Sequence, residues 1–113
     1  MKGGIQMTFK EKLENFKSKP VGFHIVSEEI AWLLSKVFTQ DKLKMRNKLS
    51  YDFILGVGWG KYGKTGELYV SYNNIYTGSK VLAYGNTSIS GKGTSVIYEI
   101  TKEELKEYLE EVG

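Results

Sequence analysis

The 113-residue chain contains no cysteine, one proline and one histidine. Without cysteine, disulfides, thiolate nucleophiles and cysteine-based metal sites are excluded. No apolar run reaches the roughly 18 residues that a membrane span requires. The N-terminus lacks the apolar core of a signal peptide. We therefore expect a soluble, cytoplasmic protein, and its length allows one domain with one modest core.

Groups that usually carry catalysis are scarce. His24 is the only histidine and lies in an apolar run, where a histidine is usually structural. It has no aspartate or cysteine nearby in the sequence. Both aspartates, Asp41 and Asp52, lie apart from it, and no metal-ligand spacing is present. We expect no enzymatic activity, no metal site and no cofactor.

Helix and strand signals alternate along the chain. Capping boxes at Thr8–Glu11 and Thr101–Glu104 predict two helix starts, and Ser27 predicts another. Strands are expected at residues 21–26, 42–59 (with a turn at 46–48), 67–73, 80–84 and 94–100. The short connections favour antiparallel neighbours. The prediction is an α+β domain over residues 8–113, with a meander of four or five antiparallel strands between N-terminal helices and a C-terminal helix.

Residues 1–7 are interpreted as a leader or disordered N-terminus. The Lys2-Gly3-Gly4 segment can be encoded by a consensus ribosome-binding sequence a few codons before Met7. Translation would then start at Met7. Such a signal, in a chain rich in Lys, Asn, Ile and Tyr, favours a low-GC Gram-positive genome or its phage.

A row of cations precedes the middle of the chain. If residues 42–48 are extended, the four side chains project from one side about 7 Å apart, which resembles phosphate spacing in an extended nucleic acid. We call this set the cationic comb: Lys42, Lys44, Arg46 and Lys48. Rings and lysines that follow it would stack bases and meet phosphates. The alternative is an edge strand that its lysines keep from aggregating.

Residues 58–65 satisfy the phosphate-loop pattern G-x-x-x-x-G-K-[ST]. That chemistry requires a buried strand before the loop and a helix directly after it. Gly66 follows Thr65, and residues 67–74 favour strand and turn. We interpret residues 60–66 as a glycine-rich hairpin connection. A pocket for a small phosphorylated ligand that depends on Lys64 is the weaker alternative.

Aromatic residues and the charged tail suggest binding surfaces. Trp32 lies opposite the apolar stripe of its predicted helix. The last 13 residues carry two Lys and five Glu, so the closing helix presents either a solvated face or an acidic surface to a basic partner. The candidate partner-binding residues are Trp32, Trp59, Lys61, Tyr62, Lys64, Tyr69 and Tyr72.

These observations favour a small non-catalytic binding protein encoded by a phage or mobile element. It would bind and inhibit or modulate a host protein, such as a nuclease or defence enzyme. The alternative is a single-stranded nucleic-acid-binding module that uses the comb and the rings. The two hypotheses differ in whether neutralising the comb abolishes binding.

Overall fold

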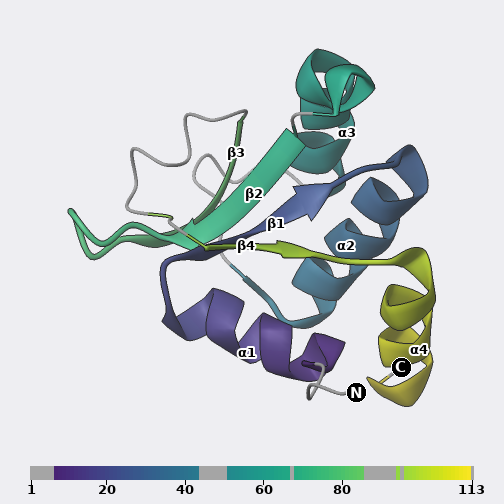
Figure 1. Ribbon diagram of the computed structural model, residues 1–113, viewed down its shortest axis with the longest axis horizontal. Coiled ribbons are helices and arrows are strands. Elements are labelled where there is room, and N and C mark those ends of the chain that lie inside the picture. The colour runs from purple at the N-terminus through teal and green to yellow at the C-terminus, as the bar shows by residue number, and fades with distance from the viewer. Residues whose placement is uncertain (1–6, 44–50, 67, 86–93, 95, 113) are drawn as a thin grey trace, which may run out of the picture.

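The fold consists of a mixed four-stranded sheet with helices packed against it (Figure 1). The computed structural model describes residues 7–43, 51–66, 68–85, 94 and 96–112, with the backbone alone described at 51–55, 57 and 112. The described elements are α1 (Phe9–Ser18), β1 (Val21–Ile25), α2 (Glu28–Gln40), α3 (Tyr51–Tyr62), the 3₁₀ helix η1 (Gly63–Thr65), β2 (Leu68–Asn73), β3 (Lys80–Gly85), β4 (Val96–Glu99) and α4 (Lys102–Val112).

The sheet confirms the α+β class and corrects the expected meander. The strand order is β3-β2-β1-β4, with β1 antiparallel to β2 and parallel to β4. Strands β3 and β4 therefore lie at opposite edges, about 14 Å apart at the usual strand spacing. Residues 86–95 connect them, and ten residues can span about 33 Å. This connection is long enough to carry the chain across the sheet, which the expectation of short antiparallel links did not allow for.

Helices α1 and α2 build the core against one face of the sheet. The Phe16 ring of α1 stacks on Phe23 of β1 at 4.5 Å and on Phe38 of α2 at 5.3 Å between centroids. All three side chains are buried, as are Leu34 and Leu105 from α2 and α4. One continuous apolar layer thus joins the helices to the sheet.

The predicted helix starts are confirmed by their hydrogen bonds. The Thr8 hydroxyl accepts from the Glu11 amide at 3.2 Å, and the Thr8 amide donates to the Glu11 carboxylate at 3.0 Å. The same reciprocal pair joins Thr101 to Glu104. Ser27 caps α2. None of the helices in the described part of the chain combines the length and apolar character that crossing a membrane requires.

The strand expected at residues 42–59 is wrong where the structure describes it. Residues 51–62 form α3, and Lys42 lies in a turn with φ 57°. The expected turn at 46–48 lies outside the described residues. The period-2 pattern arose in part because glycines alternate with apolar residues, and helix contacts override the strand preference that such alternation suggests.

Glycines place α3 between α2 and the sheet. A Cβ on Gly56 would lie 3.8 Å from the Trp32 ring of α2. A Cβ on Gly58 would lie 2.9 Å from the Tyr84 ring and 3.3 Å from Leu68. Because residues two apart point about 200° from each other on a helix, the two glycines face opposite neighbours. Residues that resemble strand breakers in the sequence are therefore close-packing points of a helix.

Candidate protein-binding groove

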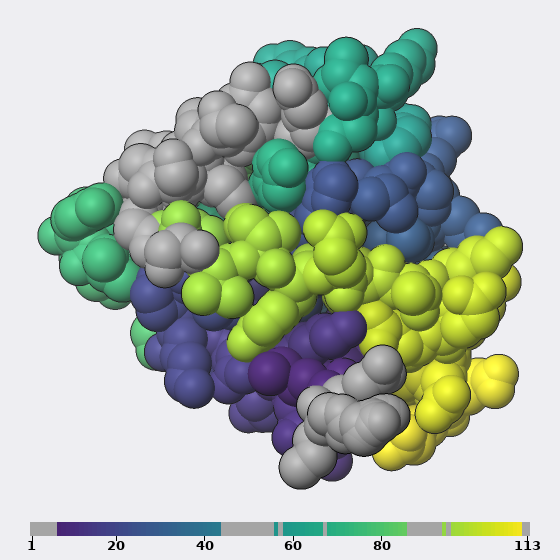
Figure 2. Space-filling view, in the orientation of Figure 1, coloured from purple at the N-terminus to yellow at the C-terminus, as the bar shows by residue number. Residues whose placement is uncertain are grey.

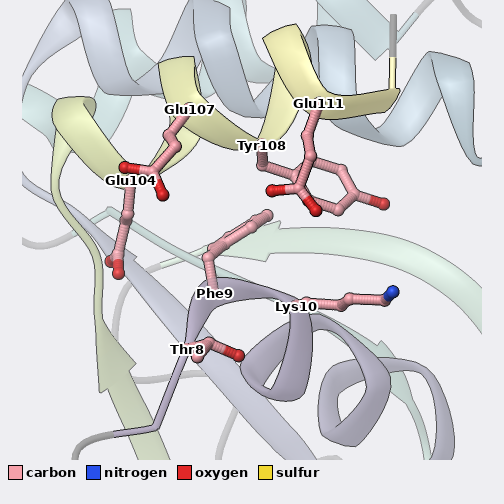
Figure 3. Close-up of a pocket in the computed structure, with 7 residues that line it drawn as sticks. All are labelled: Thr8, Phe9, Lys10, Glu104, Glu107, Tyr108 and Glu111. Atoms are coloured by element: carbon pink, nitrogen blue, oxygen red, sulfur yellow. The ribbon is translucent and has the colours of Figure 1, made fainter.

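A groove opens between the beginning of α1 and the exposed side of α4 (Figure 3). Its volume is about 330 Å³. We call it the α1–α4 groove, and its lining residues are Thr8, Phe9, Lys10, Glu104, Glu107, Tyr108 and Glu111. Three carboxylates against one ammonium group make its lining acidic.

Two aromatic rings form the apolar floor of the groove. Phe9, in the first turn of α1, is 4% exposed, and Tyr108 of α4 is half-buried. Their rings meet edge to face at 5.2 Å between centroids and 69° between planes. This is a favoured aromatic geometry and fixes both rings. The Thr8 cap sets where α1 begins and so places Phe9 beneath α4.

The three carboxylates differ in their hydrogen-bond and ion-pair partners. Glu104 accepts from the Thr101 amide at 2.9 Å and pairs with the Lys12 ammonium at 3.1 Å. Glu107 and Glu111 have no hydrogen bond or ion pair to any residue that the structure describes. They lie four residues apart, hence on one side of α4. Figure 3 shows both side chains directed toward the groove, so these two carboxylates are available to a ligand.

A polar cluster behind the groove holds the Tyr108 ring in place. The Tyr108 hydroxyl donates to Asp41 at 3.4 Å, and Asp41 pairs with the Lys17 ammonium at 3.0 Å. Burial, followed by the charge of Asp41, raises the pKa of Tyr108. Burial lowers the pKa of Lys17, but Asp41 and Glu14 outweigh it and the net shift is upward. The cluster therefore keeps Tyr108 neutral and joins α1, α2 and α4.

This chemistry suits a side chain with an apolar stem and a cationic head. Lysine and arginine lay their methylene groups on apolar surface and keep their charge at the rim. Here the stem would contact Phe9 and Tyr108, and the head would reach Glu107 and Glu111. Across the described residues, no group of three or more His, Asp or Glu side chains is placed to hold a metal ion.

Four of the predicted partner-binding residues lie close together in the chain, in the last turn of α3 and in η1. Lys61 and Lys64 are exposed, while Trp59 and Tyr62 are half-buried. Trp59 lies over Gly63, where an added Cβ would collide with its ring. Tyr62 meets Tyr84 at 6.4 Å between centroids. Both rings are thus engaged in packing within the fold.

Tyr69 and Tyr72 lie on opposite faces of the sheet. Tyr69 stacks on His24 at 4.7 Å, on the face away from α1. Tyr72 stacks on Phe16 at 6.0 Å, on the core face. The structure therefore does not combine these two rings into one stacking surface.

Trp32 is the most exposed aromatic of the predicted set. It is 44% exposed on α2, and one edge of its indole lies against Gly56 of α3. Part of the Trp32 ring therefore packs between two helices, and the rest is exposed to solvent.

The phosphate-loop pattern falls on the end of a helix. Helix α3 and η1 precede Gly66, which adopts φ 77° and donates to the Gly63 carbonyl at 2.9 Å, and β2 follows. The Thr65 hydroxyl donates to the Tyr62 carbonyl at 2.9 Å. A phosphate would face the negative end of the helix dipole. The hairpin connection expected at residues 60–66 is also wrong, because these residues complete a helix.

The cationic comb is described only at Lys42, which is exposed and lies in the turn after α2. Its left-handed φ interrupts an extended run at the first comb position. Lys44, Arg46 and Lys48 lie outside the described residues.

His24 joins three strands on the face of the sheet away from α1. Its Nδ1 lies 3.0 Å from the Glu99 carboxylate of β4, and its Nε2 lies 2.7 Å from the Gly66 carbonyl. The ring stacks on Tyr69 of β2. Both ring nitrogens thus face oxygen acceptors of neighbouring elements, which is an arrangement for fixing the turn before β2.

The groove was only half visible in the sequence. The five Glu of residues 101–113 indicated an acidic closing helix, but Phe9 lies near the other end of the chain and has no local signal for its contact with Tyr108. No family model, curated protein or solved structure matches this chain. The chemistry of the groove must therefore carry the functional argument.

Proposed function

We propose that this chain is a small non-catalytic binding protein that holds a basic segment of a partner protein in the α1–α4 groove. The observation that carries the proposal is the pairing of a fixed aromatic floor with two uncommitted carboxylates, Glu107 and Glu111. A preformed floor lowers the entropy cost of binding.

The partner we propose is a host protein whose activity is inhibited or modulated when its basic segment is covered. Nucleases and other enzymes of nucleic-acid defence use lysine and arginine against phosphates. An acidic groove at Glu107 and Glu111 would compete for those side chains. A phage or mobile-element origin, as the sequence suggests, would give such an inhibitor its role.

Fluorescence anisotropy with labelled heptapeptides tests the proposal. The peptides carry a central Arg or Lys between leucines, and a matched peptide carries Gln at that place. Replacing Glu107 and Glu111 by Gln should weaken binding of the basic peptides about tenfold, since exposed ion pairs contribute up to about 1 kcal/mol each. The Gln peptide should bind poorly to every variant.

The matched control replaces Glu103 and Glu110 by Gln. Both lie on α4 outside the groove lining, so the net charge changes equally. Basic peptides should bind this control as they bind the unmodified chain. Equal losses in both variants would show a diffuse charge effect and would reject the groove as the binding site.

A further inference from the structure

Two large apolar side chains stand exposed at the end of the β2–β3 hairpin. Ile75 is 55% exposed and Tyr76 is 72% exposed. Figure 1 shows this hairpin projecting at one end of the longest axis of the molecule. We call Ile75 and Tyr76 the hairpin tip. We interpret this adjacent exposed apolar pair as a contact surface.

The turn that carries the tip is held by its own hydrogen bonds. The Asn74 amide donates to the Ser79 carbonyl at 2.9 Å, and the Gly78 amide donates to the Asn74 carbonyl at 2.8 Å. The Asn74 side-chain oxygen accepts from the amides of Tyr76 at 2.9 Å and Thr77 at 3.3 Å. Gly78 supplies the left-handed φ of 72°. The tip is therefore ordered before it binds, which reduces the entropy lost on association.

The hairpin is also cationic relative to the rest of the chain. Residues 68–85, which form the hairpin, contain Lys80 and no Asp or Glu. Lys80 is exposed at the start of β3, opposite Asn73 and four residues after Tyr76 in the same hairpin. A matching surface would be apolar at its floor and acidic at its rim.

The α1–α4 groove has that chemistry. It offers the rings of Phe9 and Tyr108 to an apolar side chain and the carboxylates of Glu107 and Glu111 to a lysine. We propose that the chain associates head to tail, with the hairpin tip of one copy seated in the α1–α4 groove of the next. This inference rests on the proposed function, because it names a second copy as an occupant of the same groove.

The positions of the two surfaces determine the kind of assembly. The hairpin and α4 lie toward opposite ends of a molecule that extends 39 Å along its longest axis (Figures 1 and 2). In the proposed end-to-end contact, two copies leave one tip and one groove free at the outer ends. Such a head-to-tail contact produces a ring or an open chain. The average mass should therefore keep rising past the dimer as concentration increases.

Sedimentation velocity of the full chain tests the proposal. The range runs from about 10 µM to about 1 mM, because a contact of this size lies at the weak end of protein interfaces. The tip variant replaces Ile75 and Tyr76 by Ser, and the groove variant replaces Glu107 and Glu111 by Lys. Each should remain monomeric. Their equimolar mixture should form a one-to-one heterodimer and stop there, since only one competent tip and one competent groove remain.

Two matched controls accompany these variants. Val96 and Ile97, the exposed apolar pair of β4, are replaced by Ser, and Glu103 and Glu110 are replaced by Lys. Both controls should associate like the unmodified chain. A chain that stays monomeric throughout the range, association that survives either test variant, or a mixture that does not pair would overturn the inference. Peptide binding is measured at about 1 µM, where a weak self-contact is dissociated, so it tests the proposed function separately.

Discussion

At the scale of single residues, two glycines of α3 test how tightly this helix is packed. A Cβ at Gly58 would lie 2.9 Å from the Tyr84 ring, whereas one at Gly60 would meet nothing within 4 Å. Gly60→Ala should stabilise the fold by about 0.5–1 kcal/mol through the helix preference alone. Gly58→Ala should destabilise it by about 1–2 kcal/mol, because overpacking exceeds that gain. Urea unfolding measures both, and equal stabilisation would contradict the packing described for α3.

A second residue-scale prediction concerns Lys17, Asp41 and Tyr108. The pKa values of Lys17 and Tyr108 are both raised in the folded state. The folded chain therefore binds these protons more tightly than the unfolded chain, and stability should fall as pH rises above about 10. Asp41→Asn should be less stable than the unmodified chain at about pH 9, and the difference should shrink by about pH 11 as Lys17 loses its charge and Tyr108 gains one.

Denaturant unfolding at the two pH values measures that difference. Glu103→Gln, at an exposed position on α4, serves as the control. Its effect should stay nearly constant over the same range. A constant difference for Asp41→Asn would show that the cluster does not contribute in the way its pKa shifts indicate.

At the scale of elements, the packing of α3 on α2 depends on Trp32. Its indole covers Gly56, so Trp32→Ala should cost about 1–2 kcal/mol, less than for a fully buried tryptophan because the ring is partly exposed. Amide hydrogen exchange in α3 should accelerate, while Trp32→Phe should restore part of the protection. Unchanged exchange in α3 would instead leave Trp32 as a surface available to a partner.

The elements also show which sequence signals were sufficient. The starts of α1, α2 and α4 were predictable because Thr8, Ser27 and Thr101 act within three residues of their bonding partners. Helix α3 was not, because its glycines gain their meaning from the rings of Trp32 and Tyr84 in other elements. The parallel pairing of β4 with β1 was not predictable either. It places β4 at the edge opposite β3, and no local sequence pattern specifies that position.

The candidate groove also has one part that local sequence predicts and one part that depends on a long-range contact. The acidic side of α4 follows from the spacing of Glu107 and Glu111, since residues four apart share one side of a helix. The floor depends on a contact between Phe9 and Tyr108, which lie near opposite ends of the chain. The aromatic residues predicted from the sequence to bind a partner lie at separate places in the fold. Tyr69 and Tyr72 face opposite ways, since three steps along a strand reverse the side of the sheet.

At the scale of the whole molecule, charge is separated along the chain and in space. Residues 101–113 hold five of the 13 acidic side chains, and α4 places them at one end of the molecule (Figure 2). The charged residues between Glu67 and Glu99 are both lysines. The β2–β3 hairpin in this stretch projects toward the other end of the molecule (Figure 1). A molecule with this separation can attract a basic surface at one end and an acidic surface at the other.

The same separation bears on nucleic-acid binding, the alternative suggested by the cationic comb. A protein that binds single-stranded nucleic acid needs aromatic rings and cations along one continuous surface. Here Trp59, Tyr69 and Tyr72 pack in three different environments. We expect labelled single-stranded DNA and RNA to bind no more tightly than about 100 µM at moderate salt. Replacing Lys42, Lys44, Arg46 and Lys48 together by Ala should leave the anisotropy unchanged. Micromolar binding that weakens with salt and disappears in this variant would establish the comb as a nucleic-acid site and would displace the protein-binding proposal.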